Sequence, residues 1–577
     1  MKQKIHEQRH AKEGEGTDSV SGRNPRTGSK KGATKYIFVV GGVMSGVGKG
    51  VATSSIGTIL KARGLTVTAL KIDPYINVDA GTMNPTEHGE VAVLVDGDEC
   101  DQDMCNYERF LDVSLTSDNY MTTGRVYQTV IARERNLEYK GKCVQVVPHI
   151  PEEVIRRIKC ATENAKADVA VIEIGGTVGE YENILFIEAV RMLKLKQPDD
   201  VAVVMVSYLP VPNKIGEMKT KPTQHAVRTL NSNGVHPDFI IARSDCALDK
   251  KRKEKMALFC NVAEERIVSA PDVESIYDVP INFEKDNLSD HLLERLHLTP
   301  RQPSDLRAWK TFVRKSKEAK EKVTIAVVGK YFDTGDFVLS DAYISVLEAI
   351  KFSAYKLGVR PDIRWVNAKD FEAGEDPSAL AWADGILVPG GFGGSGVEGM
   401  IKVIEYARTH AVPYFGICYG MQLMVVEYAR HVLMRSRAHT VEIDPDTSDP
   451  VIDIMPEQKK VLIAGKYGGT MRLGAYPAHL KRGTLARALY GVDVIEERHR
   501  HRYEVNPEYV AALEAEGLVF SGTSPDSSLM EIAELPRGTH PFFLGTQFHP
   551  EFTARPLHPQ PLFTGFVKAA LSRRAER

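Results

Sequence analysis

The sequence predicts an α/β protein that contains two successive domains, each built on a parallel β-sheet. Short runs of aliphatic and β-branched residues, such as YIFVVG and VAVIEI, alternate with segments of helix length. This is the pattern of parallel strands that are covered by helices on both faces. A charged, proline-containing stretch interrupts the series once, and a second series opens at Val323 with VTIAVVG. A chain of 577 residues is also too long for one hydrophobic core.

Composition divides the chain into four segments. Residues 1–35 are polar and nearly devoid of bulky apolar side chains, so we expect a disordered tail. The basic character of this tail also fits contact with RNA, although a solvated extension is the simpler interpretation. Residues 36–300 carry the first series of strands and helices, and residues 322–577 carry the second. We interpret the intervening residues 301–321, which include RKSKEAKEK, as a linker.

The overall composition argues against several classes of protein. Charged residues make up 26% of the chain but the net charge is only −2, which argues against a broad nucleic-acid-binding face. The longest apolar runs are far too short to span a membrane, and the start of the chain lacks the apolar stretch of a signal peptide. Cys100 and Cys105 have no second Cys/His pair to complete a zinc site, and the scattered cysteines fit a reducing compartment. We therefore expect a cytoplasmic protein with neither nucleic acid nor membrane as a partner.

A glycine-rich turn, GGVMSGVGKG, spans residues 41–50 between a predicted strand and a predicted helix. Backbone N–H groups and the helix N-terminus can surround a phosphate there, and Lys49 adds a positive charge. Gly50 stands where the strict phosphate-loop pattern has the Ser or Thr that binds magnesium, so the ion must use carboxylates elsewhere. Glu173, at the end of a predicted strand, is a candidate because α/β sheets bind ligands at that edge. A turn that serves only packing and an acid that caps a helix are the alternative interpretations.

Two lysines, Lys219 and Lys221, lie two residues apart in KTKPTQH. In an extended loop they would face the same side and, with Gln224, form a two-pronged contact for a triphosphate. Solvated surface charge is the alternative interpretation.

The second half carries the pattern of a cysteine nucleophile. Cys418 lies between a predicted strand and a predicted helix in PYFGICYGMQ, with glycines two residues before and after it. These glycines permit the strained turn that presents a nucleophile at a helix N-terminus. His549 and Glu551, in QFHPEF, are two residues apart, so in an extended segment Glu551 can orient the imidazole of His549. The N–H groups of Gly391, in PGGFG, and of Tyr419 are expected to form an oxyanion hole.

Taken in order, these motifs resemble those of the CTP synthase family. GGVMSGVGKG, KIDPYINVDAGTMNPTEHGEV, VQVVPHIP, IEIGGTVGE, KTKPTQH and ALFCNV match the amidoligase domain of that family. The cysteine, histidine and glutamate motifs are similar to those of a class I glutamine amidotransferase, and GGTMRLG and ERHRHRYEVN narrow the match to the CTP synthase version. The resemblance covers about residues 36–570. It implies a P-loop-type amidoligase domain followed by a flavodoxin-like class I glutaminase domain.

The resemblance also implies an activity and its partners. The activity is ATP-dependent amination of UTP at C4 to give CTP, through a 4-phosphoryl-UTP intermediate, with ammonia from glutamine or from solution. This reaction belongs to pyrimidine nucleotide biosynthesis. The implied cofactors are Mg²⁺, ATP as a co-substrate and GTP as an allosteric activator. The implied assembly is a homotetramer in which a neighbouring subunit completes the UTP site, and filaments are a further expectation.

Carried over residue by residue, the resemblance assigns four sites in addition to the catalytic Cys418, His549 and Glu551. The ATP site would comprise Gly46, Val47, Gly48, Lys49, Gly50, Val51, Lys71, Asp103, Pro271, Asp272 and Val273. The UTP/CTP site would comprise Ser45, Glu180, Tyr181, Glu182, Lys219, Thr220, Lys221, Pro222, Thr223, Gln224 and Lys255. Glutamine would contact Gly391, Tyr419, Gly420, Met421, Gln422, Glu442 and Arg502. Magnesium would be held by Asp103 and Glu173.

The sequence departs from the family pattern in places. Met44 lies in the phosphate loop, and Tyr419 follows the nucleophile where the family commonly has Leu. Ser395 occupies a position that is commonly Arg, near the cleft where the family binds GTP. This departure predicts weaker GTP activation, unless Arg472, in a segment that we expect to be mobile, compensates.

Two other functions fit parts of the pattern. A different amidoligase fused to a glutaminase would act on a carboxylate of a corrin or biotin precursor, but the KTKPTQH segment argues against that substrate. An inactive, filament-forming scaffold would not need an intact phosphate loop or an intact set of Cys418, His549 and Glu551.

Overall fold

The computed structural model describes residues 34–84, 89–212, 216–330, 340–455, 458 and 470–577. Nearly all of the predicted tail therefore lies outside the described residues. Residues 34–577 form one unit that contains both predicted α/β halves. The described part of the chain contains no helix that combines the length and the apolar character needed to cross a bilayer.

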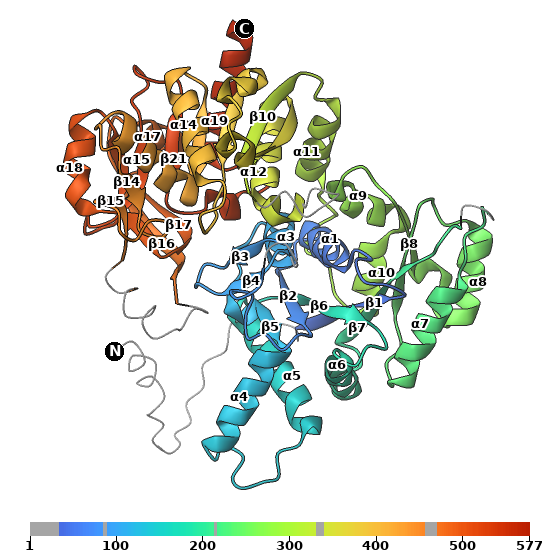
Figure 1. Ribbon diagram of the computed structural model, residues 1–577. Helices are drawn as coiled ribbons and strands as arrows, with labels where there is room; N and C mark the ends of the chain where they lie inside the picture. The colour runs from blue at the N-terminus through green and yellow to red at the C-terminus, as the bar shows by residue number, and fades with distance from the viewer. Residues whose placement is uncertain (1–33, 85–88, 213–215, 331–339, 456–457, 459–469) are drawn as a thin grey trace, which may run out of the picture. The chain divides into compact units, whose positions relative to one another are not determined.

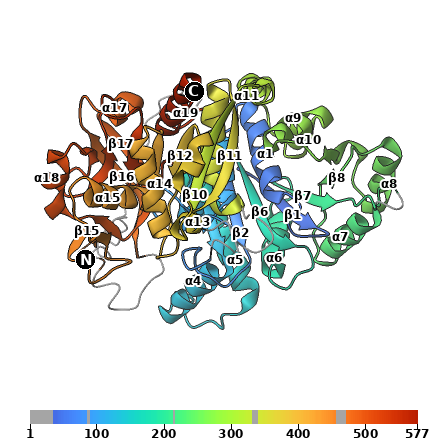
Figure 2. The same ribbon diagram turned by 45° about the horizontal axis from the view of Figure 1, so that its top comes forward.

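The first sheet has seven parallel strands in the order β5-β2-β6-β1-β7-β8-β9. Its central strands are almost entirely buried because helices cover both faces (Figures 1 and 2). One face packs on α1 and α3, and the other packs on α5, α6 and α7. The strands are β1 (Lys35–Gly42), β2 (Val67–Asp73), β5 (Tyr120–Thr122), β6 (Val169–Thr177), β7 (Val201–Tyr208), β8 (Phe239–Ser244) and β9 (Ile267–Pro271). The helices are α1 (Lys49–Ala62), α3 (Asp103–Leu111), α5 (Val146–Asn164), α6 (Ile184–Lys196) and α7 (Lys221–Ser232).

The second sheet has nine strands in the order β11-β10-β12-β13-β21-β20-β19-β16-β17. The first five of these are parallel, as predicted, but the sheet continues with four antiparallel strands. Antiparallel neighbours need no crossover helix, so short loops suffice in this part. The strands are β10 (Lys322–Gly329), β11 (Arg360–Asn367), β12 (Gly385–Val388), β13 (Tyr414–Ile417), β16 (Arg472–Leu480), β17 (Val494–His501), β19 (Val519–Thr523), β20 (Met530–Glu534) and β21 (Phe543–Thr546). The main helices are α12 (Ile344–Lys356), α14 (Val397–Thr409), α15 (Tyr419–His431) and α19 (Pro561–Glu576).

Smaller elements complete the two halves. The first half adds β3 (Val91–Val93), β4 (Glu99–Asp101), α4 (Thr123–Arg135), α8 (Lys250–Cys260), α9 (Val279–Phe283) and α10 (Leu288–Arg295). The second half adds α13 (Ala368–Glu372), β14 (Ala438–Thr440), β15 (Asp449–Ile454), α17 (Leu485–Tyr490), β18 (Tyr503–Val505) and α18 (Pro507–Ala515). Between the halves lies α11 (Arg307–Glu318).

Helix α11 lies within the segment that we predict as a linker. Its residues Trp309, Phe312 and Val313 are buried, which is the i, i+3, i+4 spacing of an amphipathic helix. Trp309 packs on Phe110 of α3, with ring centroids 5.1 Å apart, and its indole N–H donates to the carbonyl of Tyr277 at 2.8 Å. Phe312 packs on Phe352 of α12 at 5.9 Å. The segment therefore packs against both halves.

Replacing Trp309 with Ala should lower the free energy of unfolding by roughly 3–5 kcal/mol, because it removes a large buried ring and its hydrogen bond. Chemical denaturation of the full chain measures this difference. The control is Lys310→Ala at the neighbouring exposed position, which should change stability by no more than about 0.5 kcal/mol. Similar effects of the two substitutions would show that α11 does not contribute to the folded core.

Candidate active site

Cys418 lies at the turn between β13 and α15. Its φ of 50° and ψ of −98° are unusual for a residue with a side chain, so the turn is strained. The N–H of Cys418 donates to the carbonyl of Thr546 on β21 at 2.6 Å, which fixes the turn. Gly420 is required by close packing, because a Cβ there would overlap the carbonyl of Val388. This geometry presents the thiol at the N-terminus of α15, as the glycine spacing predicts.

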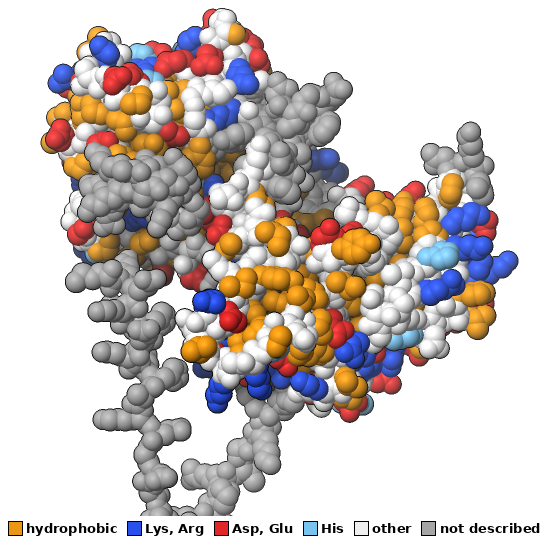
Figure 3. Space-filling model, turned by 60° about the horizontal axis from the view of Figure 1, so that its bottom comes forward, with side chains coloured by type: hydrophobic (Ala, Val, Ile, Leu, Met, Phe, Trp, Pro, Cys, Tyr) orange, Lys and Arg blue, Asp and Glu red, His pale blue; other side chains and the backbone are white. Residues whose placement is uncertain are grey.

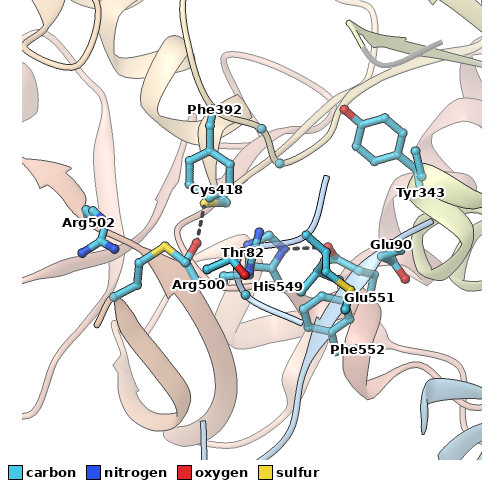
Figure 4. A pocket seen from close by; sticks show the side chains of 17 residues that line it. Thr82, Glu90, Tyr343, Phe392, Cys418, Arg500, Arg502, His549, Glu551 and Phe552 are labelled. Carbon is cyan, nitrogen blue, oxygen red and sulfur yellow. Dashed lines mark hydrogen bonds and ion pairs between the residues drawn. The ribbon is translucent and has the colours of Figure 1, made fainter. Parts of the chain in front are cut away.

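His549 and Glu551 follow β21 in the sequence, and their side chains lie beside the thiol of Cys418. The Nδ1 atom of His549 lies 2.7 Å from Oε1 of Glu551 (Figure 4). Burial by itself would lower the pKa of His549, but the carboxylate of Glu551 and the thiol of Cys418 raise it to about 10. The imidazole is therefore protonated at neutral pH. A carboxylate that orients an imidazole beside a cysteine is the arrangement of nucleophilic acyl transfer.

The thiol opens into a cavity of about 310 Å³. Residues of the second half line one side of it, and residues 81–83, Glu90 and Val91 of the first half line another (Figure 4). Glu90 accepts hydrogen bonds from the N–H and hydroxyl of Ser345 on α12. Burial raises the pKa of Glu90 to about 7, against these hydrogen bonds. Residues of both halves of the chain thus line the cavity next to Cys418.

The predicted glutamine-binding residues divide into two groups. Gly391 and Arg502 line the cavity, and Arg502 also donates to Oε1 of Gln458 at 2.7 Å. The other five do not line it: Tyr419, Gly420, Met421, Gln422 and Glu442.

Tyr419 and Glu442 hold the loop that carries Gly391. The hydroxyl of Tyr419 donates to the carbonyl of Gly393 at 3.0 Å, and Glu442 accepts from the N–H of Gly393 at 2.7 Å. Lys330, which the sequence analysis missed, also donates to the Gly393 carbonyl and lies 4.8 Å from the Tyr419 ring. Burial lowers the pKa of Lys330 to about 8, against the carboxylate of Glu442. Lys330 directly follows β10, and that position at a strand end is the signal that could have identified it.

In the first half, the ammonium of Lys71 lies between carboxylates of β2, β6 and α3. It is 3.0 Å from Glu173 and 3.7 Å from Asp73, and it also donates to Asp103. The structure thus brings the predicted metal residues Asp103 and Glu173 to one point. Burial opposes the charge on Lys71, but these carboxylates raise its pKa. Glu173, which we expected at the end of a strand, lies in the middle of β6. Asp73, which the sequence analysis missed, is the last residue of β2.

The carboxylates around Lys71 fit a hard cation such as Mg²⁺, which favours oxygen ligands. Among the described residues, no group of three or more His, Cys, Asp or Glu side chains forms a metal cluster by itself. Magnesium commonly takes only one or two carboxylates and completes its shell with water and substrate phosphates. The pair Asp103 and Glu173 meets that requirement.

The glycine-rich turn lies directly beside these carboxylates. Lys49 begins α1, and its ammonium donates to the carbonyl of Gly176 at 2.9 Å. A Cβ on Gly50 would collide with the carboxylate of Asp103, so this carboxylate would have to shift if another residue occupied that position. Gly48 and Val51 line a cleft with Pro271 and Val273, so these two members of the predicted ATP site face the turn. Asp272 accepts from Arg243 at 2.5 Å.

Most of the predicted UTP residues lie on the surface of the single chain. Tyr181 is 92% exposed, and Ser45, Glu180, Glu182 and Lys255 are also exposed. The extended geometry that we expected for residues 219–224 was wrong, because Lys221 begins α7. Proline is tolerated in the first turn of a helix, so Pro222 does not prevent this. The remaining members are Lys219, which pairs with Glu217 at 2.6 Å, the buried Thr220 and Thr223, and Gln224, which donates to Thr220 at 3.0 Å.

Two protein families match the chain. CTP synthase N-terminus matches residues 35–298, and Glutamine amidotransferase class-I matches residues 338–569. The CTP synthase of Pyrococcus abyssi is 52% identical over 546 residues, which cover 94% of this chain and 99% of that protein.

The chain belongs to the CTP synthase family.

A second relative agrees with this assignment. The CTP synthase of Pyrococcus furiosus is 52% identical over 547 residues, with the same coverage of 94% and 99%. A solved structure of the glutaminase domain of a Trypanosoma brucei CTPS with bound acivicin is 36% identical and has a TM-score of 0.40. It covers 43% of this chain and 94% of that chain. The predicted family, fold class and enzyme class are confirmed: a ligase domain is fused to a glutamine amidotransferase.

The pKa of His549 leads to a pH-dependent prediction. A pKa raised from 6.5 to about 10 in the folded chain contributes stability that is fully present below pH 6.5 and is lost as pH rises through 10. Glu551→Gln removes the main charge that raises this pKa. The variant should therefore be less stable than the original chain at pH 6, and the difference should shrink by pH 10.

Denaturant unfolding at several pH values measures this difference. Glu375→Gln, at an exposed carboxylate, serves as the control and should show a small difference that does not change with pH. A constant deficit for Glu551→Gln from pH 6 to pH 10 would contradict the proposed ion pair.

Proposed function

We propose that this member of the CTP synthase family divides its reaction between two sites, with glutamine cut at Cys418 and UTP aminated at the Lys71 site. The observation that carries the proposal is the cavity at Cys418, which is lined by residues of both halves. Because the cavity at Cys418 reaches residues of the first half, ammonia released there can be used by the first half. CTP formation from UTP, ATP and glutamine by the purified chain is the direct test.

At the first site, Cys418 attacks the amide carbon of glutamine after its thiol proton has passed to His549, and the tetrahedral intermediate collapses to a thioester. The imidazolium of His549 donates its proton to the leaving nitrogen, and Glu551 keeps the ring oriented. The N–H groups of Gly391 and Tyr419 stabilise the oxyanion, each donor contributing roughly 10²–10³ in rate. Water then releases glutamate from the thioester.

At the second site, O4 of UTP attacks the terminal phosphorus of ATP and ADP leaves, which makes the oxygen at C4 a good leaving group. Lys49 and Lys71 stabilise the transferring charge, and Asp103 and Glu173 would hold Mg²⁺, which would neutralise phosphate charge. Ammonia then adds to C4 and displaces phosphate. Ammonia in solution at neutral pH is mostly protonated and cannot attack, so passage through the shared cavity keeps it reactive.

The proposed UTP site is open on the single chain, which supports a homotetramer with shared sites. Figure 3 shows hydrophobic side chains gathered on one face of the molecule. Exposed apolar residues occur on neighbouring helices of the first half: Ile131 of α4, Val146 and Val147 of α5, and Ile184 of α6. Apolar surface of this kind commonly marks a contact between proteins. Assembly into filaments stays a prediction.

Reciprocal substitutions test the division of labour. Cys418→Ala should abolish CTP formation from glutamine but leave formation from added ammonia nearly intact. Lys49→Ala should abolish CTP formation from both nitrogen sources, because phosphoryl transfer loses a phosphate-facing charge. Loss of both activities in a folded Cys418→Ala variant would contradict the separation of sites. Ammonia-dependent activity in Lys49→Ala would remove that lysine from the reaction.

GTP activation provides a second test, at Ser395. This residue is exposed between the Gly391 loop and α14, and it replaces an Arg of the family pattern. Arg472 does not compensate, because it pairs with the buried Glu504 and Glu531 at 3.2 and 2.8 Å. Loss of one charge-assisted contact costs about 1.5–3 kcal/mol, or about tenfold or more in affinity. Ser395→Arg should therefore lower the half-activating GTP concentration, which a GTP titration of glutamine-dependent CTP formation measures. An unchanged concentration would exclude Ser395 as a GTP contact.

A further inference from the structure

Helix α3 contributes to both candidate sites. Asp103 and Tyr107 lie one turn apart on the helix and face the Lys71 site. Asp103 accepts from Lys71, and the hydroxyl of Tyr107 donates to Glu173. The next two residues, Glu108 and Arg109, are buried against the second half. One nine-residue helix thus contacts the phosphate-site carboxylates and the glutaminase half.

Glu108 makes a buried ion cluster with two arginines of the second half. Its carboxylate lies 2.8 Å from both terminal nitrogens of Arg498 and 3.1 Å from Arg555. Glu108 is 0% exposed and Arg498 is 1% exposed. Burial by itself would raise the pKa of Glu108, but the two arginines lower it, so the carboxylate is ionised. Buried charges of this kind are held in fixed geometry, because separating them leaves each charge uncompensated.

The arginine partner lies on the strand that borders the thiol. On β17, Arg498 contacts Glu108, and two residues later the carbonyl of Arg500 accepts from Sγ of Cys418 at 3.8 Å. The guanidinium of Arg500 donates to Glu99 on β4 at 2.8 Å. Arg502, two residues further along, lines the cavity. Strand β17 therefore connects α3 with residues around Cys418.

A second chain of contacts runs in parallel. Arg109 donates to the hydroxyl of Ser345 on α12 at 2.5 Å. Ser345 in turn donates to the carboxylate of Glu90, which lines the cavity with Cys418 and His549. Two neighbouring residues of α3, Glu108 and Arg109, are therefore each hydrogen-bonded to a residue that is connected to the lining of the cavity.

We propose that α3 couples the two sites, with Glu108 as a positioning residue through which nucleotide bound at Lys71 and Asp103 raises the reactivity of Cys418. The proposal rests on the proposed function for the identity of the nucleotide. Phosphate oxygens at the Lys71 site compete with Asp103 for the ammonium of Lys71 and so change the contacts at the start of α3. Packed helices shift as units rather than deform, so Glu108 and β17 follow. Coupling between sites of this kind typically changes an equilibrium or affinity by about 5–150-fold.

The test measures alkylation of Cys418 by iodoacetamide in the full chain, with and without ATP, UTP and Mg²⁺. Mass spectrometry of the Cys418 peptide distinguishes it from the exposed Cys143 and Cys246. We expect nucleotide to accelerate alkylation at least about fivefold in the original chain. Glu108→Gln should remove most of this acceleration. The readout needs no turnover, so a chain that failed to make CTP would overturn the proposed function without deciding the coupling.

The matched control is Glu153→Gln. Glu153 on α5 is also buried and also pairs with arginines, Arg133, Arg156 and Arg157, but its partners all lie in the first half. This variant should keep the full response to nucleotide. If Glu108→Gln fails to fold, Ser345→Ala breaks the parallel chain of contacts and should reduce the response. An original chain without a nucleotide response would overturn the proposal. A folded Glu108→Gln variant, or in its absence Ser345→Ala, that responds as Glu153→Gln does would also overturn it.

Discussion

The buried cluster of Glu108, Arg498 and Arg555 is the interaction on which the arrangement of the two halves depends. Three charges are removed from water at the junction, and they are tolerable only while they remain paired. The packing of α11 adds apolar contacts to both halves. The two hydrogen bonds between Arg498 and Glu108 hold β17 against α3. The same strand borders the thiol of Cys418 through the carbonyl of Arg500.

Strain and close packing define the glutaminase site. Cys418 adopts a backbone conformation that a residue with a side chain rarely takes, and the surrounding strands hold it there. Close packing at a glycine defines the site in the first half, where the absence of a Cβ on Gly50 leaves room for the carboxylate of Asp103. A larger residue at this position would require the carboxylate to shift. The reactive groups are therefore fixed by the backbone before any substrate binds.

Electrostatics at the two sites are arranged in opposite ways. At Cys418, the carboxylate of Glu551 and the sulfur of Cys418 raise the pKa of His549, so the imidazole stays charged, which suits proton donation. At Lys71, several carboxylates surround one ammonium and keep it charged. This positive charge suits the binding of a polyanionic phosphate. Lys71 occupies the region where Asp103 and Glu173 would hold magnesium. Nucleotide and metal binding must therefore rearrange these contacts together.

The sequence by itself determined the features that local spacing encodes. The alternation of apolar strands and helices predicts two α/β halves, and the motifs around Cys418, His549 and Glu551 predict the nucleophile and its partners, because each motif is short. Only the tertiary structure placed Asp73 and Lys330, showed that Lys221 begins a helix, and added antiparallel strands to the second sheet. It alone paired Glu108 with Arg498, which lies 390 residues away. Contacts between residues so distant leave no periodic or local signal in a single sequence, since they arise only when the chain brings separate elements together.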